Sequence, residues 1–303
     1  MNKICKAIKS PKLLYAYFDS KISKIYAKIL LKISNQAYIS FRYKKLFGKK
    51  INLKEPQTFA EKIQWMKLYD HDERLVICAD KYLVRDLIKE KIGEEYLIPM
   101  PFVWDSWKQI DFSSLPDKFV LKPNNSSGRV LICKDKSKLD INSAIKEIKK
   151  WEKENLTKRT GEWVYEKIPF KIVCEEYLAD DIVDYKMYFA DGKFMCTQII
   201  AGRSERAKRF GYFDDKWNLL NIRRYGYKSF VSEAEKPEKY EEMLGIAKTL
   251  AQGFKFMRVD LYYVNKKIYF GELSFYPNNG FVRYENEEMD RFFGEKIKLS
   301  SQQ

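Results

Sequence analysis

Histidine is nearly absent from this sequence of 303 residues, and its cysteines are few and dispersed. The one histidine, His71, lies among charged residues, which excludes a histidine-rich zinc site and argues against a Ser-His-Asp triad. The five cysteines form no CxxC pair, and Cys133, Cys174 and Cys196 lie within apolar runs. Because free thiols of this kind are typical of a reducing compartment, we expect a cytoplasmic protein, with the inner face of the membrane as one possible location.

Glycine, proline and long apolar runs are also scarce. The 13 glycines and 9 prolines argue against low complexity, and the 45% of apolar residues, with 20 Phe and 21 Tyr, argue against disorder. No run approaches the roughly 18 apolar residues of a transmembrane helix, and we expect no signal peptide because the N-terminus lacks a clean apolar segment. The sequence therefore predicts a folded protein with a substantial core.

Acidic residues are almost missing from the first fifty positions. Residues 1–50 hold 13 Lys and Arg but only one acid, Asp19, whereas the rest of the chain holds 44 basic and 41 acidic residues. The basic character thus belongs to an N-terminal arm. Proteins that bind nucleic acid more often carry a basic stripe on a recognisable folded module, and none is present, so we expect no nucleic-acid partner.

The arm, residues 1–50, reads as one or two basic helices. Two sets of side chains recur at helical spacing on neighbouring faces: Lys21, Lys24, Lys28 and Lys32, and Ile22, Ile25, Ile29 and Ile33. One interpretation is an arm that lies on an anionic membrane surface or polymer. The other is a helix packed on the body with its lysines in solvent.

The rest of the chain alternates helices with strand pairs, which predicts an α+β fold. Thr58 and Glu61 form the capping box of a helix over 56–69. Further helices are expected at 81–91, 139–154 and 238–252. Strands are expected at 119–122, 130–133, 172–174, 184–190, 193–200, 257–263 and 267–274, with hairpin turns at Asp191-Gly192 and around Asn265-Lys266. A basic loop is expected over 202–212.

The last hairpin carries the most specific pattern. Because side chains alternate along a strand, each strand has one polar face: Arg258, Asp260 and Tyr262 in the first, and Phe270, Glu272 and Ser274 in the second. A turn centred on Lys266 would place Asp260 opposite Glu272 and Arg258 opposite Ser274. Opposed carboxylates repel unless a cation lies between them, and oxygen ligands with open positions suit Mg²⁺. The alternative is a solvated face on which Arg258 neutralises the acids.

Two weaker features precede this hairpin. Lys122 ends a strand before the small-residue loop Asn125–Gly128, a combination that favours an anion such as phosphate. Glu175 and Glu176 end another strand, where backbone groups and an acid could contact a nucleoside. Each feature alone is also typical of strand ends that bind nothing.

In this order the motifs resemble the ATP-grasp superfamily, and within it the TupA-like group linked to teichuronopeptide and polysaccharide biosynthesis. The resemblance covers about residues 45–298 and rests on these segments: Pro56–Trp65, Ala79-Asp80-Lys81, Val120–Pro123, Cys174–Leu178, Asp184-Tyr185-Lys186, Arg258–Leu261 and Glu272-Leu273-Ser274. It implies an ATP-grasp fold, in which two α+β lobes clamp ATP, here with a basic helical arm. The expected divisions are the arm (1–50), a helical linker lobe (51–116), the small lobe (117–180) and the large lobe with the metal site (181–303).

The resemblance also implies a role for individual residues. ATP would be bound by Lys81 and Lys122 at its phosphates and adenine side, by the closing loop Asn125, Ser126, Ser127 and Gly128, by Glu175, Glu176 and Leu178 at the adenine, and by Asp184 at the ribose or substrate. Mg²⁺ would be bound by Asp260, Glu272 and Ser274. Lys186 would contact a phosphate and Arg258 would stabilise negative charge during acyl transfer. At Ser274 many ATP-grasp enzymes have Asn as a metal ligand, whereas the TupA-like group often has a hydroxyl there. The loop also departs from the expected sequence, which is richer in His and Gly.

The predicted function is that of an ATP-dependent ligase. It would phosphorylate a small-molecule or glycan carboxylate to an acyl phosphate, which an amine then attacks to form an amide, in the synthesis of a cell-surface polysaccharide. The basic loop Arg203–Arg209 is either a lid over the phosphates or a solvated loop. Two other hypotheses stay open: a glycosyltransferase with Asp180-Asp181 on a metal, and a non-catalytic adaptor bound to membrane or polymer.

Overall fold

The computed structural model describes residues 11–154, 156–180, 182–201, 209–229 and 234–299. Its α-helices are α2 (Pro11–Ile33), α3 (Asn35–Phe47), α4 (Phe59–Tyr69), α5 (Arg74–Ala79), α6 (Val84–Lys91), α7 (Ile141–Lys153), α8 (Thr157–Thr160), α9 (Tyr240–Ala251) and α10 (Glu287–Glu295). Its strands are β1 (Phe102–Trp104), β2 (Phe119–Pro123), β3 (Leu131–Cys133), β4 (Ile172–Glu176), β5 (Asp184–Ala190), β6 (Lys193–Ala201), β7 (Arg209–Phe213), β8 (Lys228–Ser229), β9 (Phe256–Val264) and β10 (Lys267–Ser274). Short 3₁₀ helices are η1 (Glu94–Tyr96), η2 (Trp107–Gln109), η3 (Lys136–Lys138), η4 (Trp163–Lys167) and η5 (Pro277–Gly280). The α+β prediction is confirmed.

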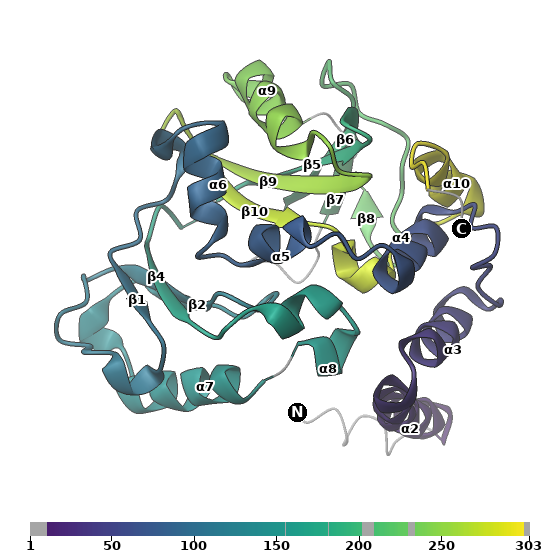
Figure 1. Ribbon diagram of the computed structural model, residues 1–303, viewed down its shortest axis with the longest axis horizontal. Helices are drawn as coiled ribbons and strands as arrows, with labels where there is room; N and C mark the ends of the chain where they lie inside the picture. The colour runs from purple at the N-terminus through teal and green to yellow at the C-terminus, as the bar shows by residue number, and fades with distance from the viewer. Residues whose placement is uncertain (1–10, 155, 181, 202–208, 230–233, 300–303) are drawn as a thin grey trace.

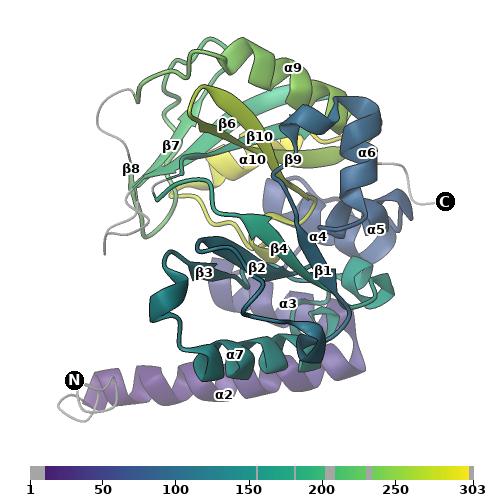
Figure 2. The same ribbon diagram turned by 90° about the vertical axis from the view of Figure 1, so that its left-hand side faces the viewer.

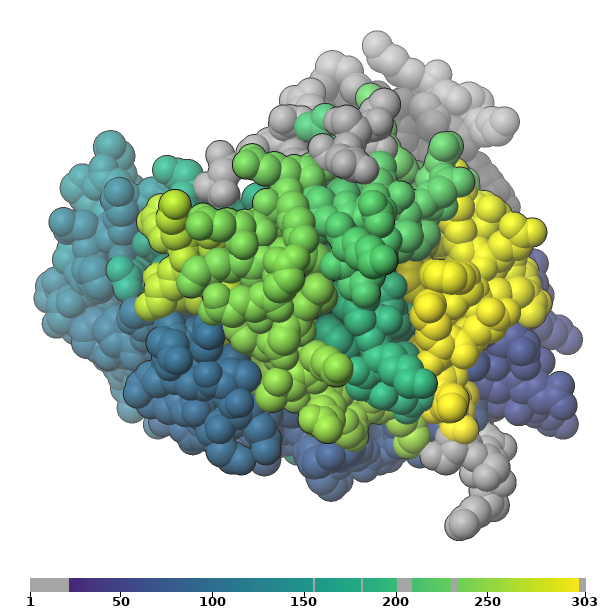
Figure 3. Space-filling view, turned by 90° about the horizontal axis from the view of Figure 1, so that it is seen from above, coloured from purple at the N-terminus to yellow at the C-terminus, as the bar shows by residue number. Residues whose placement is uncertain are grey.

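The strands form two sheets that face each other. The four-stranded sheet has the order β1-β4-β2-β3, and the six-stranded sheet has the order β10-β9-β5-β6-β7-β8. Figure 1 shows the smaller sheet and α7 below the larger sheet, with α9 above it. Figure 3 shows the molecule from above, where the light-green segment that contains α9 lies between a blue segment and the yellow C-terminal segment. Each sheet buries its own hydrophobic cluster, and β1 joins the smaller sheet through β4.

Helix α4 begins where the sequence predicts it. Thr58 accepts a bond from the Glu61 amide, and Glu61 accepts one from the Thr58 amide, so the predicted capping box is confirmed. A second carboxylate reaches this helix end from α10, because Asp290 accepts the amide of Ala60 at 3.1 Å. Asp290 is buried, and this burial raises its pKa to about 7.

Asp290 gives the fold a pH-dependent stability. Its pKa is higher in the folded state than the ordinary 3.8, so the folded state retains a proton that the unfolded chain has lost. Stability should therefore fall as pH rises from about 4 to 7, and stay low above that window. We expect Asp290→Asn to be about 2 kcal/mol more stable than the wild type near pH 8, with no gain near pH 4. Urea unfolding at both pH values measures this, and an equal effect at both would contradict it.

The basic arm forms two helices that pack on the body. Tyr38, Ile39 and Tyr43 of α3 are buried against Ala60 of α4 and Phe281, which follows β10. Figure 2 shows α2 running along the lower edge of the molecule, below α7. This packing agrees with the interpretation of the arm as a helix packed on the body. It does not explain the outer side of α2. Within the described residues, no helix is both long and apolar enough to cross a bilayer.

The β9–β10 hairpin has the predicted pairing, but a different geometry produces it. The turn is the two-residue Asn265-Lys266 with positive φ at both positions, so Val264 pairs with Lys267. This turn alone would place Asp260 opposite Gly271. A β-bulge between Phe270 and Glu272 adds one residue to β10 and restores the pairing of Asp260 with Glu272.

The bulge corrects one expectation. Phe270 was predicted on the face of Glu272 and Ser274, but it pairs with Leu261 and lies in the core with it. Paired residues share a face, and Asp260 faces the opposite way from its neighbour Leu261. Phe270 therefore lies on the other side of the sheet from Glu272, because the extra residue resets the alternation.

The bulge requires glycine at position 271. A Cβ there would lie 2.9 Å from the backbone oxygen of Asp260 and 3.1 Å from Cζ of Tyr262. We expect Gly271→Ala to cost about 1–3 kcal/mol in the free energy of unfolding, because backbone must move to admit the methyl group. The matched control is Gly245→Ala in α9, where nothing lies within 4 Å and alanine should stabilise the helix by about 0.4–1 kcal/mol. Urea unfolding of both variants tests this, and similar effects would refute the bulge as the cause.

The predicted basic loop 202–212 is wrong at its C-terminal end. Residues Arg209–Phe213 form β7, which pairs with β6 through contacts such as Ile200 with Phe210. Gly211 lies inside this strand, so its presence does not mark a loop. The rest of the lid candidate, residues 203–208, lies outside the described residues.

Candidate active site

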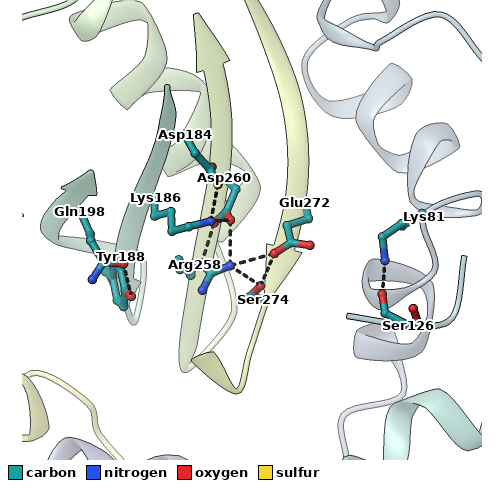
Figure 4. A network of polar contacts seen from close by, with 10 residues as sticks. All are labelled: Lys81, Ser126, Asp184, Lys186, Tyr188, Gln198, Arg258, Asp260, Glu272 and Ser274. Carbon is teal, nitrogen blue, oxygen red and sulfur yellow. Dashed lines mark hydrogen bonds and ion pairs between the residues drawn. The ribbon is translucent and has the colours of Figure 1, made fainter. Parts of the chain in front are cut away.

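A row of charged side chains crosses three neighbouring strands on the inner face of the larger sheet (Figure 4). Lys186 on β5 pairs with Asp260 on β9, and Asp260 pairs with Glu272 on β10. Arg258 and Ser274 pair two residues further along the same two strands. The predicted convergence of Asp260 and Glu272 on one face is confirmed, whereas their role as metal ligands stays a prediction.

Arg258 connects the two carboxylates. Its Nε and Nη2 atoms donate to Asp260 at 2.6 and 2.8 Å, and Nη2 also donates to Glu272 Oε1 and Ser274 Oγ at 2.8 and 2.9 Å. The Ser274 hydroxyl in turn donates to Glu272 Oε1 at 3.3 Å. Because the guanidinium is planar and rigid, this fork fixes the spacing of the two acids.

Lys186 neutralises the acids from the other side. Its ammonium pairs with Asp260 and lies 2.7 Å from Asp184 Oδ2. All three side chains are buried. A group of buried charges such as this one is stable only when each charge is paired, so Lys186, Arg258 and the carboxylates depend on one another.

The two central acids have opposite pKa shifts. Burial raises the pKa of Asp260 to about 6, against the lowering effect of Arg258 and Lys186. Burial also acts to raise the pKa of Glu272, but Arg258, Lys186, Lys81 and Lys122 outweigh it and lower that pKa to about 2. Glu272 is therefore held as an anion by positive charge from both lobes.

Two lysines approach this cluster, one from the segment between α5 and α6 and one from β2 of the smaller sheet. Asp80 bonds the amides of Tyr82 and Leu83 and the side chain of Asn124, which ties the start of α6 to the loop after β2. Lys81 then donates to the carbonyl of Ser126 in that loop. Burial lowers the pKa of Lys81, while Glu272 acts to raise it.

The loop after β2 contains an unsatisfied hydroxyl. Ser126 is buried, and its Oγ has no hydrogen-bond partner within the part of the chain that the structure describes. Lys122, on the strand before the loop, pairs with Glu175 on β4. A buried donor without a partner beside two lysines is a favourable environment for an anion.

Two adjoining clefts lie between the sheets. The first is lined by five of the predicted residues: Lys81, Ser127, Glu175, Glu272 and Ser274. The second shares Ser127, Glu272 and Ser274 with the first and adds Arg258. Ser127, Glu272 and Ser274 thus line both clefts, and a molecule bound in one would meet a molecule bound in the other at these side chains.

The remaining predicted residues stand apart from these clefts. Glu176 is exposed, Leu178 is half-buried, and Asn125 donates to the carbonyl of Ile168 at 3.4 Å. Gly128 has a positive φ of 75°, consistent with a tight loop. None of these four residues lines either cleft, so their nucleotide contacts stay predictions. The other predicted residues outside both linings are Lys122, Ser126, Asp184, Lys186 and Asp260.

The second cleft also contains a polar group that was not predicted from the sequence. Glu162 and Asn279 line that cleft, and the buried Lys67 of α4 donates to Asn279 Oδ1 at 2.6 Å. Burial raises the pKa of Glu162 and lowers that of Lys67. One feature of the sequence could have indicated this group. Lys67 follows Ile63 by four residues, which places a charged side chain on the apolar side of the predicted helix.

The acidic turn of the glycosyltransferase hypothesis is not in the site. Asp180 is exposed, pairs with Lys134 and accepts a bond from Tyr177 at 2.6 Å. Asp181 lies outside the described residues. Within those residues no group of three or more His, Cys, Asp or Glu side chains is arranged to hold a metal.

Comparison with known proteins gives a family match and distant structural similarities. A family model described as TupA-like ATPgrasp matches residues 61–298. A D-alanine–D-alanine ligase from Bacillus anthracis has 19% identity and a TM-score of 0.39, with 65% of this chain and 57% of that chain covered. The D-alanine–D-alanine ligase from Helicobacter pylori has 13% identity and a TM-score of 0.43, with 80% of this chain and 70% of that chain covered. An L-amino acid ligase from Bacillus licheniformis has 13% identity and a TM-score of 0.41, with 73% of this chain and 49% of that chain covered. The chain therefore spans little more than half of the first of these proteins, and no curated protein matches the sequence.

Proposed function

The chain belongs to the TupA-like ATP-grasp family, and from this premise we propose that it is an ATP-dependent carboxylate–amine ligase that acts through an acyl phosphate. The ATP-grasp fold and ligase chemistry predicted from the sequence agree with this family. The observation that carries the proposal is that Arg258 joins Asp260 to Glu272 on one lobe, and that Glu272 lines a cleft which Lys81 and Glu175 complete from the other side.

ATP and Mg²⁺ fit the residues present. Asp260 and Glu272 are hard oxygen donors on one face, and Mg²⁺ typically takes one or two carboxylates and completes its shell with phosphate oxygens and water. Two protein carboxylates are therefore enough when a nucleotide supplies the rest. Lys81 and Lys122 provide positive charge across the cleft, and the buried Ser126 hydroxyl is available to a phosphate oxygen. When bound, the cation would neutralise phosphate charge and help to orient the terminal phosphate.

The proposed reaction has two transfers. A carboxylate oxygen forms a bond to the γ-phosphorus of ATP while the bond from that phosphorus to the β,γ-bridging oxygen breaks, which releases ADP. The amine nitrogen then forms a bond to the acyl carbon, the bond from carbon to the phosphate oxygen breaks, and inorganic phosphate leaves. Neither step needs a nucleophilic side chain, so positioning and electrostatics supply the catalysis.

The chain's own groups divide these tasks. Arg258 reaches both the carboxylates and the second cleft, where its guanidinium would stabilise the negative charge of acyl transfer. Lys186 holds Asp260 in place through their ion pair. If the Asp260 side chain rotated toward a bound cation, the Lys186 ammonium would be released to contact a phosphate. Glu162, whose pKa is raised by burial, is suited to accept the proton that the amine nitrogen loses as the amide bond forms.

The function is tested by ADP release from the full-length protein. A panel of carboxylic acids, including uronic acids and amino acids, is combined with a panel of amines at constant ATP and Mg²⁺. Turnover that requires both an acid and an amine, with one phosphate released per ADP, would support the ligase. Melting experiments with ATP and with sugar nucleotides form the second arm, because a shift with sugar nucleotides alone would replace the ligase with a glycosyltransferase.

We also propose that the acid or the amine belongs to a cell-surface polysaccharide. This step is supported by the family, and no contact in the structure specifies a sugar. A uronic acid as the preferred acid in the same panel would support it. Strict preference for free amino acids on both sides would limit the protein to small-molecule ligation.

A further inference from the structure

Helix α2 has a row of apolar side chains on its outer side. Ile22, Ile25, Ile29 and Ile33 are 64, 60, 49 and 74% exposed, and their spacing of three and four residues places them on one face of the helix. Tyr26 borders them, with its ring edge-on against Phe41 of α3 at 4.9 Å between ring centroids. We call Ile22, Ile25, Ile29 and Ile33 the α2 stripe. Its contiguous apolar surface distinguishes it from isolated exposed residues, which need no explanation.

The stripe is not the face that packs on the body. Ala27 is buried, and Leu30 and Leu31 are partly buried in the cluster that α2 shares with α3. These three residues lie on a different side of the helix from Ile22, Ile29 and Ile33. The helix thus has apolar side chains on two sides, and the fold covers only one of them.

The charge beside the stripe is of a single sign. Lys24, Lys28 and Lys32 are exposed along its flank, and no ion pair engages them within the described residues. Residues 20–54 contain ten Lys and Arg and no Asp or Glu. A second copy of the chain would bring these lysines together across the stripe, and their repulsion would oppose such a dimer.

The position of α2 leaves the stripe accessible. The helix extends along one edge of the molecule in Figure 2, on the opposite side of the body from α9. Its inner side packs toward the body, since Leu31 of α2 and Asn35 of α3 lie close to Gly161, which follows α8.

We propose that the α2 stripe and its lysines dock the protein on an anionic lipid surface. An apolar face flanked by lysines, without acidic residues, is the pattern of a helix that lies in the plane of a membrane interface. The isoleucines would enter the boundary between head groups and acyl chains, and the lysines would attract the anionic head groups. Docking goes beyond the proposed ligase activity and is independent of it.

The test is sedimentation of the full-length protein with vesicles, without ATP. Vesicles of about two parts phosphatidylcholine to one part phosphatidylglycerol are compared with phosphatidylcholine alone. We expect binding to the first that weakens at high salt, and little binding to the second. Ile25→Ser/Ile29→Ser/Ile33→Ser should weaken binding at least about tenfold, and Lys24→Gln/Lys28→Gln/Lys32→Gln about a hundredfold.

The matched control is Ile77→Ser/Ile132→Ser/Ile141→Ser, which removes three exposed isoleucines outside the arm and should bind as the wild type does. Unchanged melting temperatures would show that the variants fold. The lysine variant tests the proposal independently of the isoleucine variant, because its three side chains are exposed and their replacement should not disturb folding. Unaltered binding of the stripe variant, or no vesicle binding by the wild type, would overturn the proposal. A wild-type dimer that the stripe variant converts to a monomer, without vesicle binding, would assign the stripe to a second copy instead.

Discussion

Replacing Asp260 with Asn and Glu272 with Gln together is expected to reduce ADP formation at least about a thousandfold. The two carboxylates lie opposite each other on β9 and β10, and Lys81 and Lys122 contribute to holding Glu272 as an anion. Amides of the same size remove their negative charge with little change in shape. ADP release with the best acid and amine pair measures the effect.

The charge of the cluster makes the result interpretable. Removing two anions leaves Arg258 and Lys186 with fewer partners, so the variant should bind ATP without Mg²⁺ at least as tightly as the wild type does. Added Mg²⁺ should no longer strengthen ATP binding, because the two carboxylates that would hold the cation are gone. The control is Glu285→Gln/Glu288→Gln, which changes two exposed acids near α10 and should leave turnover intact. Undiminished ADP release by the site variant would remove the metal assignment and the ligase with it.

The sequence predicted those elements whose signals are local, whereas α5, α10, β1, β7 and β8 were not predicted. The capping box at Thr58 and the turns at Asp191-Gly192 and Asn265-Lys266 each depend on a few adjacent residues, and all three appear in the structure. The pairing of Asp260 with Glu272 was predicted from a turn centred on Lys266, whereas the real turn is the pair Asn265-Lys266, which shifts the register by one residue. The bulge at Gly271 compensated for that error, and a glycine inside a strand was the signal that could have revealed it.

The site was predictable only where its residues lie on paired strands. Asp260, Glu272 and Arg258 are neighbours through backbone pairing, so alternation was enough to bring them together. The group formed by Lys67, Glu162 and Asn279 joins three segments that are distant in sequence, and no local pattern indicates which of them meet. The stripe on α2 was visible as a helical repeat, but only the packing of α3 shows that its isoleucines remain outside.

The balance of charge in the site explains why the arginine is needed in addition to a lysine. Lys186 already supplies one positive charge to Asp260 and Asp184. Arg258 differs because it holds Asp260 with two nitrogens while one of them also reaches Glu272 and Ser274. An ammonium at the same position could keep the charge but could not maintain all of these bonds.

Arg258→Lys is therefore expected to lower kcat about a hundredfold while changing ATP affinity less than about threefold. The retained charge protects the buried carboxylates, whereas Arg258→Met would leave them underpaired and cost about 3–5 kcal/mol of stability. Arg291→Lys in α10, an exposed arginine paired with Glu287, is the matched control and should have full activity. Steady-state kinetics and urea unfolding together separate the two effects. A kcat loss confined to Arg258→Met would show that only the positive charge matters, and an equal loss in affinity and kcat would place Arg258 at the nucleotide instead of the acyl group.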